Sequence, residues 1–279
     1  MTKSKKAAEK PAKKAKPKLS VSRGANRPPR ILIYGENGVG KTKLAADIGE
    51  GIIIDCEDGA GHVPVDRFQW EDGRTRPKTL DEIYDALRLI YKAGGDYDTV
   101  IIDGMDELER LIWEKICSSQ RDKNGQPYKS IEQFGYGKGY TQAGEELRRF
   151  ADVLESMGGK GFAVVLVGHA SVATVRNPMG EDYDKFTLMM HKNAAGFLFG
   201  WVDICAFMEF ETAINNKPGT KGEDAPKIAN YTNTRVLHLE SAAGYTAKAR
   251  SEYEIPAEFV VEKELPWQPI REALEGKAE

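Results

Sequence analysis

ILIYGENGVGKT, residues 31–42, decides the fold of this chain. Its first four residues are apolar and predict a buried strand, and the pattern Gly35-x-x-x-x-Gly40-Lys41-Thr42 follows directly. Residues 41–48 then predict a helix. A glycine-rich loop between a strand and a helix is the context that a phosphate-binding loop requires. The stretch therefore predicts a site for a nucleoside triphosphate.

The parts of this loop have separate roles. The glycines let the backbone turn so that its N–H groups face a phosphate, and the start of the helix adds a partial positive charge. Lys41 is expected to reach the β and γ phosphates, and the Thr42 hydroxyl to bind Mg²⁺. ATP and Mg²⁺ are the predicted cofactors. The predicted nucleotide-binding residues are Gly35, Glu36, Asn37, Gly38, Val39, Gly40, Lys41 and Thr42.

The composition favours a soluble globular protein. Of the 279 residues, 41% are hydrophobic and 30% charged, and no apolar run approaches the length of a membrane span. The basic N-terminus is not followed by the apolar segment of a signal peptide. The cysteines are too far apart for a zinc pattern or a disulfide framework, so we expect a cytoplasmic protein without membrane partners.

The first residues form a basic arm. Residues 1–30 carry eight Lys and three Arg against one Glu, a net charge of +10, which leaves −13 for the rest of a chain whose total is −3. Low hydrophobicity predicts that the arm is disordered. It either finds phosphate backbones or keeps the protein soluble. The predicted organisation is an arm at 1–29, a core at 30–262 and a C-terminal extension at 263–279.

Carboxylates follow two further apolar strands. Residues 52–55 predict a strand that is followed by Glu57, and residues 99–103 predict one that ends in Asp103. The second has the form of a Walker B strand, in which Asp103 joins Thr42 in holding Mg²⁺. An ordinary aspartate at the end of a strand is the alternative. Between them, a capping box at 79–82 predicts a helix that ends at Gly94.

The second half of the chain continues the alternation of strands and helices. Predicted strands cover residues 162–167, 202–210, 235–239 and 245–250, and a predicted helix covers 145–157. Strands that alternate with helices indicate an α/β fold with a mainly parallel central sheet flanked by helices.

Long polar stretches at 120–140 and 170–195 predict loops, as does 211–230. Loops of this length within a domain are usually functional or disordered. Aromatic side chains and a Lys in the glycine-rich first stretch suit stacking on unpaired bases, whereas a flexible surface loop is the alternative. The candidate residues for DNA binding are Tyr136, Lys138, Arg176, Lys185, Phe186 and Lys192.

Several of these positions resemble RecA-type recombinases. Glu57 matches the glutamate after the second strand that polarises the attacking water, and Asp103 matches the Walker B position. His169 lies where RecA proteins have a polar sensor of the γ phosphate, a Gln in bacterial RecA. The stretches 120–140 and 170–195 occupy the places of the two DNA-binding loops. The resemblance implies a RecA-like P-loop NTPase with catalytic roles for Glu57, Lys41, Asp103 and His169.

Lys248 and Arg250 match a segment in which RecA has two lysines, one residue apart, that reach the ATP of the neighbouring subunit. Alternation along a strand would place both cations on one face. The resemblance implies a catalytic role in trans and ATP at subunit interfaces. Two solvated charges on an edge strand are the alternative.

The core, about residues 30–256, is similar to the phage single-domain RecA-like proteins of the Sak-type single-strand annealing family. This resemblance implies an ATPase that binds single-stranded DNA and promotes annealing or strand exchange in the host cytoplasm. A homo-oligomer, ring or filament, is implied, with a single-strand DNA-binding protein as a further partner. The alternatives are an ATP-dependent switch or loader for replication proteins, and a small-molecule phosphotransferase, which the lack of a compact Arg-rich lid disfavours.

Overall fold

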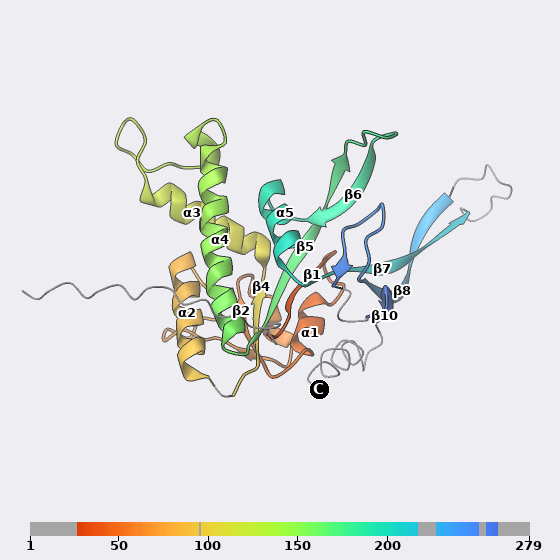
Figure 1. The fold of residues 1–279 in the computed structure, drawn as a ribbon, viewed down its shortest axis with the longest axis horizontal. Coiled ribbons are helices and arrows are strands. Elements are labelled where there is room, and N and C mark those ends of the chain that lie inside the picture. The colour runs from red at the N-terminus through yellow and green to blue at the C-terminus, as the bar shows by residue number, and fades with distance from the viewer. Residues whose placement is uncertain (1–26, 95, 217–226, 251–254, 262–279) are drawn as a thin grey trace, which may run out of the picture.

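A mainly parallel sheet runs through the centre of the molecule (Figure 1). The computed structural model describes residues 27–94, 96–216, 227–250 and 255–261. The strand order is β10-β8-β7-β1-β5-β4-β2-β3, with β6 paired to β5 and β9 paired to β7. The strands are β1 (Arg30–Gly35), β2 (Gly51–Asp55), β3 (Asp66–Arg67), β4 (Thr99–Asp103), β5 (Ala163–Val175), β6 (Tyr183–Leu188), β7 (Ile204–Asn216), β8 (Lys227–His238), β9 (Lys248–Ala249) and β10 (Glu258–Val260).

The helices cover both faces of this sheet. They are α1 (Lys41–Ala46), α2 (Leu80–Ala93), α3 (Met105–Ser119), α4 (Lys138–Gly159) and α5 (Lys192–Trp201), with short 3₁₀ turns at Ala60–His62 and Ile131–Phe134. None of the helices in the described ranges is both long and apolar enough to cross a membrane.

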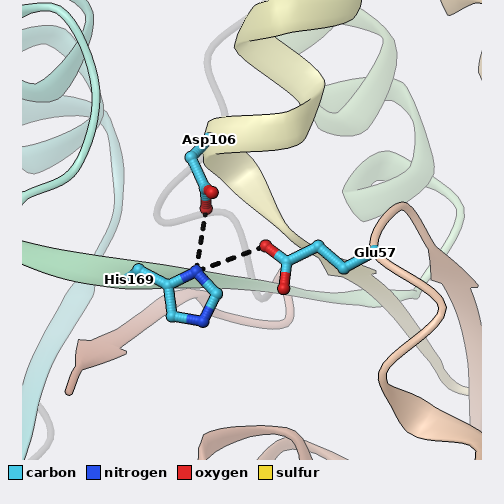
Figure 2. A group of neighbouring side chains, drawn as sticks. All are labelled: Glu57, Asp106 and His169. Carbon is cyan, nitrogen blue, oxygen red and sulfur yellow. Dashed lines mark hydrogen bonds and ion pairs between the residues drawn. The ribbon is translucent and has the colours of Figure 1, made fainter. Parts of the chain in front are cut away.

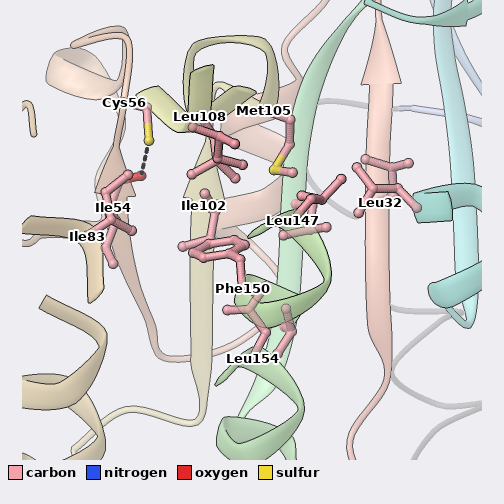
Figure 3. Packing of buried hydrophobic residues seen from close by; sticks show 14 of the residues in the cluster. Leu32, Ile54, Cys56, Ile83, Ile102, Met105, Leu108, Leu147, Phe150 and Leu154 are labelled. Carbon is pink, nitrogen blue, oxygen red and sulfur yellow. Dashed lines mark hydrogen bonds between the residues drawn. The ribbon is translucent and has the colours of Figure 1, made fainter. Parts of the chain in front are cut away.

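Alternation along the strands divides the core into two layers. Ile31 and Ile33 of β1 point towards α1, whereas Leu32 and Tyr34 point towards the opposite face. That second face carries α2 to α5, and Figure 3 shows how Phe150 of α4 and residues of α2 and α3 pack over the strands there. The sheet is therefore enclosed on both sides, as a parallel sheet requires.

The phosphate loop, residues 35–42, follows the carboxyl end of β1, which lies in the middle of the strand order. β1 pairs in parallel with β5 on one side and with β7 on the other, and β4 lies beyond β5. The parallel strands β1, β2, β4 and β5 present their carboxyl ends in the same direction. Open α/β sheets bind ligands at the carboxyl ends of their strands, at the point where the connections from neighbouring strands run to opposite sides of the sheet.

The first half of the chain follows the predicted elements closely. β4 has the predicted bounds, and the Thr79 hydroxyl caps α2 by accepting from the backbone N–H of Glu82, 3.2 Å away. Gly94 ends α2 as predicted. The helix after the phosphate loop is shorter than predicted and ends at Ala46, because its last turn tightens and Ile48 N–H donates to Ala45 O.

The predicted loop at 170–195 is wrong. β5 does not end at His169 but continues to Val175, and its outer half pairs antiparallel with β6. Residues 192–201 then form α5. The β5–β6 hairpin extends away from the body of the sheet (Figure 1).

Two other predicted loops are largely regular structure. α4 begins at Lys138 rather than at residue 145, and buried Ile131 lies in a 3₁₀ turn that packs against it. The stretch 211–230 contains the ends of β7 and β8, which pair from Phe207 to Asn216 of β7 in a second extended hairpin. The prediction of a strand at 245–250 holds only for residues 248–249.

The predicted arm covers residues 1–29; its residues 1–26 and the extension at 263–279 lie outside the described residues. Arg27, placed in the arm by the sequence, is part of the packed fold. Its guanidinium donates two hydrogen bonds to the carboxylate of Asp203, at 2.7 and 2.9 Å.

Candidate nucleotide-binding site

The phosphate loop has a backbone that glycines make possible. Gly38 and Gly40 have φ values of 77° and 99°, in the left-handed region that favours glycine. Gly35 pairs with Met208 of β7, and a β-carbon on Gly35 would lie 1.9 Å from the Met208 carbonyl oxygen. A side chain at residue 35 would therefore push the loop away from β7.

Lys41 closes the loop from within. Its Nζ donates to the carbonyl oxygen of Glu36, 2.8 Å away, and the side chain is buried. Burial lowers the pKa of Lys41, whereas Asp103 and Glu57 raise it. A buried cation held across the loop is in place to meet the phosphates of a nucleotide.

Thr42 and Asp103, which the sequence assigns to Mg²⁺, lie in contact. The Thr42 hydroxyl donates to Asp103 Oδ2 over 2.7 Å. Burial raises the pKa of Asp103 to about 6, and the Thr42 hydrogen bond acts in the opposite direction. A hydroxyl oxygen beside a carboxylate is a donor set that suits Mg²⁺, which prefers oxygen ligands and binds through few protein groups. These two residues fit the predicted metal site.

Glu57, Asp106 and His169 form a cluster beside this pair, the His169 cluster (Figure 2). Nδ1 of His169 lies 3.3 Å from Asp106 Oδ1 and 3.3 Å from Glu57 Oε1. Within the described residues, Glu57 Oε1 is buried and has no further hydrogen-bond partner. The structure thus brings together Glu57 and His169, which come from different strands, and adds Asp106 to them.

The two carboxylates change the charge state of the histidine. The hydrogen bond to Asp106, followed by the contact with Glu57, raises the pKa of His169 to about 9. The imidazole therefore carries a positive charge at neutral pH. The same contact with His169 helps to hold the pKa of Asp106 below its usual range.

Glycine and aspartate hold Glu57 in position. Gly104 has a φ of 95°, and a β-carbon there would lie 2.6 Å from Glu57 Cγ. The buried Asp55 carboxylate accepts from the N–H groups of Gly59 and Ala60, and from Arg67 at 2.8 Å. These contacts fold the segment after β2 back on itself and direct Glu57 towards His169.

Sequence reasoning missed Asp106, Asp55 and Gly104. Asp106 lies three residues after Asp103, in the first turn of α3. A carboxylate in the first turn of the helix that follows a Walker B strand was the available signal, because this turn starts at the same edge of the sheet.

The candidate DNA-binding residues are spread over three elements. Tyr136 is fully exposed in the segment before α4, and Lys138 begins that helix. Arg176 and Lys185 lie on the β5–β6 hairpin, and Lys192 begins α5. Phe186 is half-buried, and its ring stacks on Phe207 with 5.1 Å between centroids.

Lys248 and Arg250 lie at the opposite end of the sheet from the phosphate loop, because β9 pairs with the first residues of β7. Lys248 Nζ donates to the Gly200 carbonyl oxygen at 3.2 Å, and Arg250 Nε lies 3.0 Å from Asp203 Oδ1. These contacts are made within one chain, so a role towards a neighbouring subunit stays a prediction.

The comparison with known families agrees with this geometry. A family model described as an AAA domain (AAA_24) matches residues 27–251. No protein with a curated description matches the chain. The matched range begins at the residue where the described structure begins and contains the phosphate loop, Asp103 and the His169 cluster.

Proposed function

Because the chain belongs to the AAA-domain family, whose members are generally nucleotide-binding ATPases, we propose that it hydrolyses ATP to act on single-stranded DNA. The proposed outcome is annealing or strand exchange in phage recombination, carried out by a RecA-like homo-oligomer. The observation that carries the ATPase assignment is the placement of Thr42 and Asp103 beside the His169 cluster at one edge of the sheet.

The residues of the chain divide the work of hydrolysis. Lys41 and the loop N–H groups hold the phosphates, and Glu57 orients a water and accepts its proton. His169 is a positioning residue, since its cation fixes the direction of the Glu57 carboxylate. Mg²⁺ bound by Thr42 and Asp103 would supply positive charge to the phosphate oxygens.

The net positive charge of the segment between α3 and α4 supports this segment as a binding site for DNA phosphates. Residues 120–138 contain four Lys or Arg and two Asp or Glu, a net charge of +2, and the exposed Tyr136 lies among them. The hairpin segment 170–188 contains two cations and three carboxylates, a net charge of −1. Phosphate contacts depend on cations, so the first segment is the stronger candidate.

The test measures ATP turnover with and without single-stranded DNA, beside an annealing assay with complementary oligonucleotides. We expect DNA to raise turnover and annealing to require ATP. Lys41→Ala serves as the control variant that is expected not to bind nucleotide. DNA affinity should fall steeply with salt, and deletion of residues 1–26 should flatten this dependence if the arm contacts phosphates. The proposal would be contradicted if single-stranded DNA did not change ATP turnover and the protein did not anneal the oligonucleotides.

The second candidate is an ATP-dependent switch or loader that recruits replication proteins. A switch needs ATP to change its shape but has little use for a carboxylate that orients water. Glu57, held in place by Gly104 and His169, therefore favours hydrolysis. If Glu57→Gln annealed DNA or recruited its partner as well as the natural chain, the switch would be the better description.

A further inference from the structure

Arg235 places a guanidinium beside the phosphate loop. A β-carbon built on Gly40 would lie 2.8 Å from Nη1 of Arg235. Gly40 directly precedes Lys41, so this cation adjoins the part of the loop that faces a bound phosphate chain. No feature of the sequence near residue 235 indicates such a position.

The sheet holds Arg235 in this place. It lies on β8 opposite Phe210 of β7, and β7 in turn pairs Met208 with Gly35 at the start of the phosphate loop. On the other side of β8, the Arg235 carbonyl oxygen accepts from Val261 N–H at 2.7 Å. The backbone of Arg235 is therefore fixed on both sides.

In the ranges that the structure describes, the guanidinium of Arg235 makes no ion pair with a carboxylate. By contrast, two other arginines that lie against the sheet pair with buried carboxylates, Arg67 with Asp55 and Arg30 with Asp203. A half-buried guanidinium beside a phosphate loop, with no carboxylate partner in the described part of the chain, suits an anionic ligand, and its planar donors match phosphate oxygens.

We propose that Arg235 binds the phosphate chain of the nucleotide in its own subunit, at the end nearer the nucleoside. Asp103 and Glu57, which mark the γ-phosphate end, follow β4 and β2, whereas Arg235 approaches from β8, on the other side of β1. This inference rests on the proposed binding of ATP. In this role Arg235, which belongs to the β7–β8 hairpin, would contact ADP as well as ATP.

The test measures binding of ADP and ATP by calorimetry to the full chain and to Arg235→Ala, Arg235→Met and Arg235→Lys. Loss of a charge-assisted contact should weaken both nucleotides by about tenfold to a hundredfold in the Ala and Met variants. Arg235→Lys should recover part of the affinity. Turnover at saturating ATP should stay within a few fold, because the contact is not at the γ phosphate.

Two controls separate the possible causes. Arg88→Ala removes an exposed arginine of α2 that pairs with Asp85 and should leave affinity unchanged. Arg235→Met keeps most of the aliphatic stem, and melting curves establish that it is folded. If Arg235→Ala and Arg235→Met both bound nucleotide as tightly as the unmodified chain while Lys41→Ala lost binding, the role of Arg235 would be wrong and the proposed nucleotide binding would stand. A loss confined to ATP would overturn the assignment to the nucleoside end, and a natural chain that binds no nucleotide would overturn the proposed function too.

Discussion

The Thr42 hydroxyl donates a 2.7 Å hydrogen bond to Asp103 Oδ2. This bond ties the phosphate loop to the end of β4. The two oxygens that would share a Mg²⁺ ion are thus already adjacent, and less conformational freedom has to be lost when the ion binds. Preorganisation of this kind raises affinity without adding contacts.

Replacing Lys41 by Ala should weaken ATP binding by about tenfold to a hundredfold or more, because it removes the buried cation of the phosphate loop. Calorimetric titration with ATP and Mg²⁺ measures the effect. Lys43→Ala is the matched control, since Lys43 lies on the same helix but is exposed. Unchanged affinity in Lys41→Ala would remove the nucleotide from this loop.

Replacing Glu57 by Gln should preserve ATP binding and lower turnover by about 10²- to 10⁴-fold, the usual contribution of a general base. Phosphate release at saturating ATP measures this. Asp58→Asn is the control, because Asp58 is exposed and paired with Arg67. Natural turnover in Glu57→Gln would assign the base elsewhere, with Asp106 the nearest candidate.

The stability of the nucleotide-free protein should fall as pH rises through about 9. The folded state raises the pKa of His169 from its ordinary 6.5 to about 9, so its contribution is complete below pH 6.5 and lost as the imidazole deprotonates. Urea unfolding between pH 6 and 10 measures the effect. The difference in stability between the natural chain and His169→Gln should shrink across this window, and a constant difference would contradict it.

Tyr136 and Phe186 should respond differently to replacement by Ala. Loss of the exposed Tyr136 ring should weaken binding of single-stranded DNA by about 1–3 kcal/mol at most and leave stability unchanged. Loss of Phe186, which stacks on Phe207, should lower the free energy of unfolding. Fluorescence anisotropy with a labelled oligonucleotide and urea unfolding measure the two quantities. Natural DNA affinity in both variants would remove the two segments from the proposed interface.

Arg250→Ala and Lys41→Ala should each abolish turnover alone, and mixtures of the two should recover part of it. The reason is that a mixed interface pairs an intact phosphate loop with an intact Arg250 from its neighbour, as an arginine finger acts in trans. Arg27 and Arg30 also hold Asp203, so Arg250→Ala keeps that carboxylate paired and the fold intact. Normal hydrolysis by Arg250→Ala in the presence of DNA would exclude the trans role.

Patterns within one short segment predicted much of the fold. Apolar runs predicted β1 and β4, and the capping box from Thr79 to Glu82 predicted the start of α2. The β5–β6 hairpin was missed because its outer residues, such as Thr174 and Asp184, are exposed. A hairpin with few buried side chains lacks the alternation of apolar and polar residues that predicts a strand. The hydrogen bonds between its backbones do not depend on residue type, so they cannot be predicted from the sequence.

The site was predictable only where a motif carries it. Lys41, Thr42 and Asp103 belong to recognisable patterns, and Asp106 follows Asp103 by three residues, whereas Arg235 comes to the phosphate loop through the order of strands in the sheet. That order depends on the packing of the whole domain, and no local signal encodes it.

β5 connects the candidate site to the surface without a break. It is paired to β1 and β4 along its inner half and to β6 from Ala170 to Val175. His169 lies at the junction, about 20 Å from the end of the strand at ~3.3 Å per residue. His169 pairs with Gly35 of β1, and the next residue, Ala170, pairs with Leu188 of β6. The backbone that carries the imidazole is therefore held by strand pairing on both sides of the junction, and the hairpin and the His169 cluster share one continuous strand.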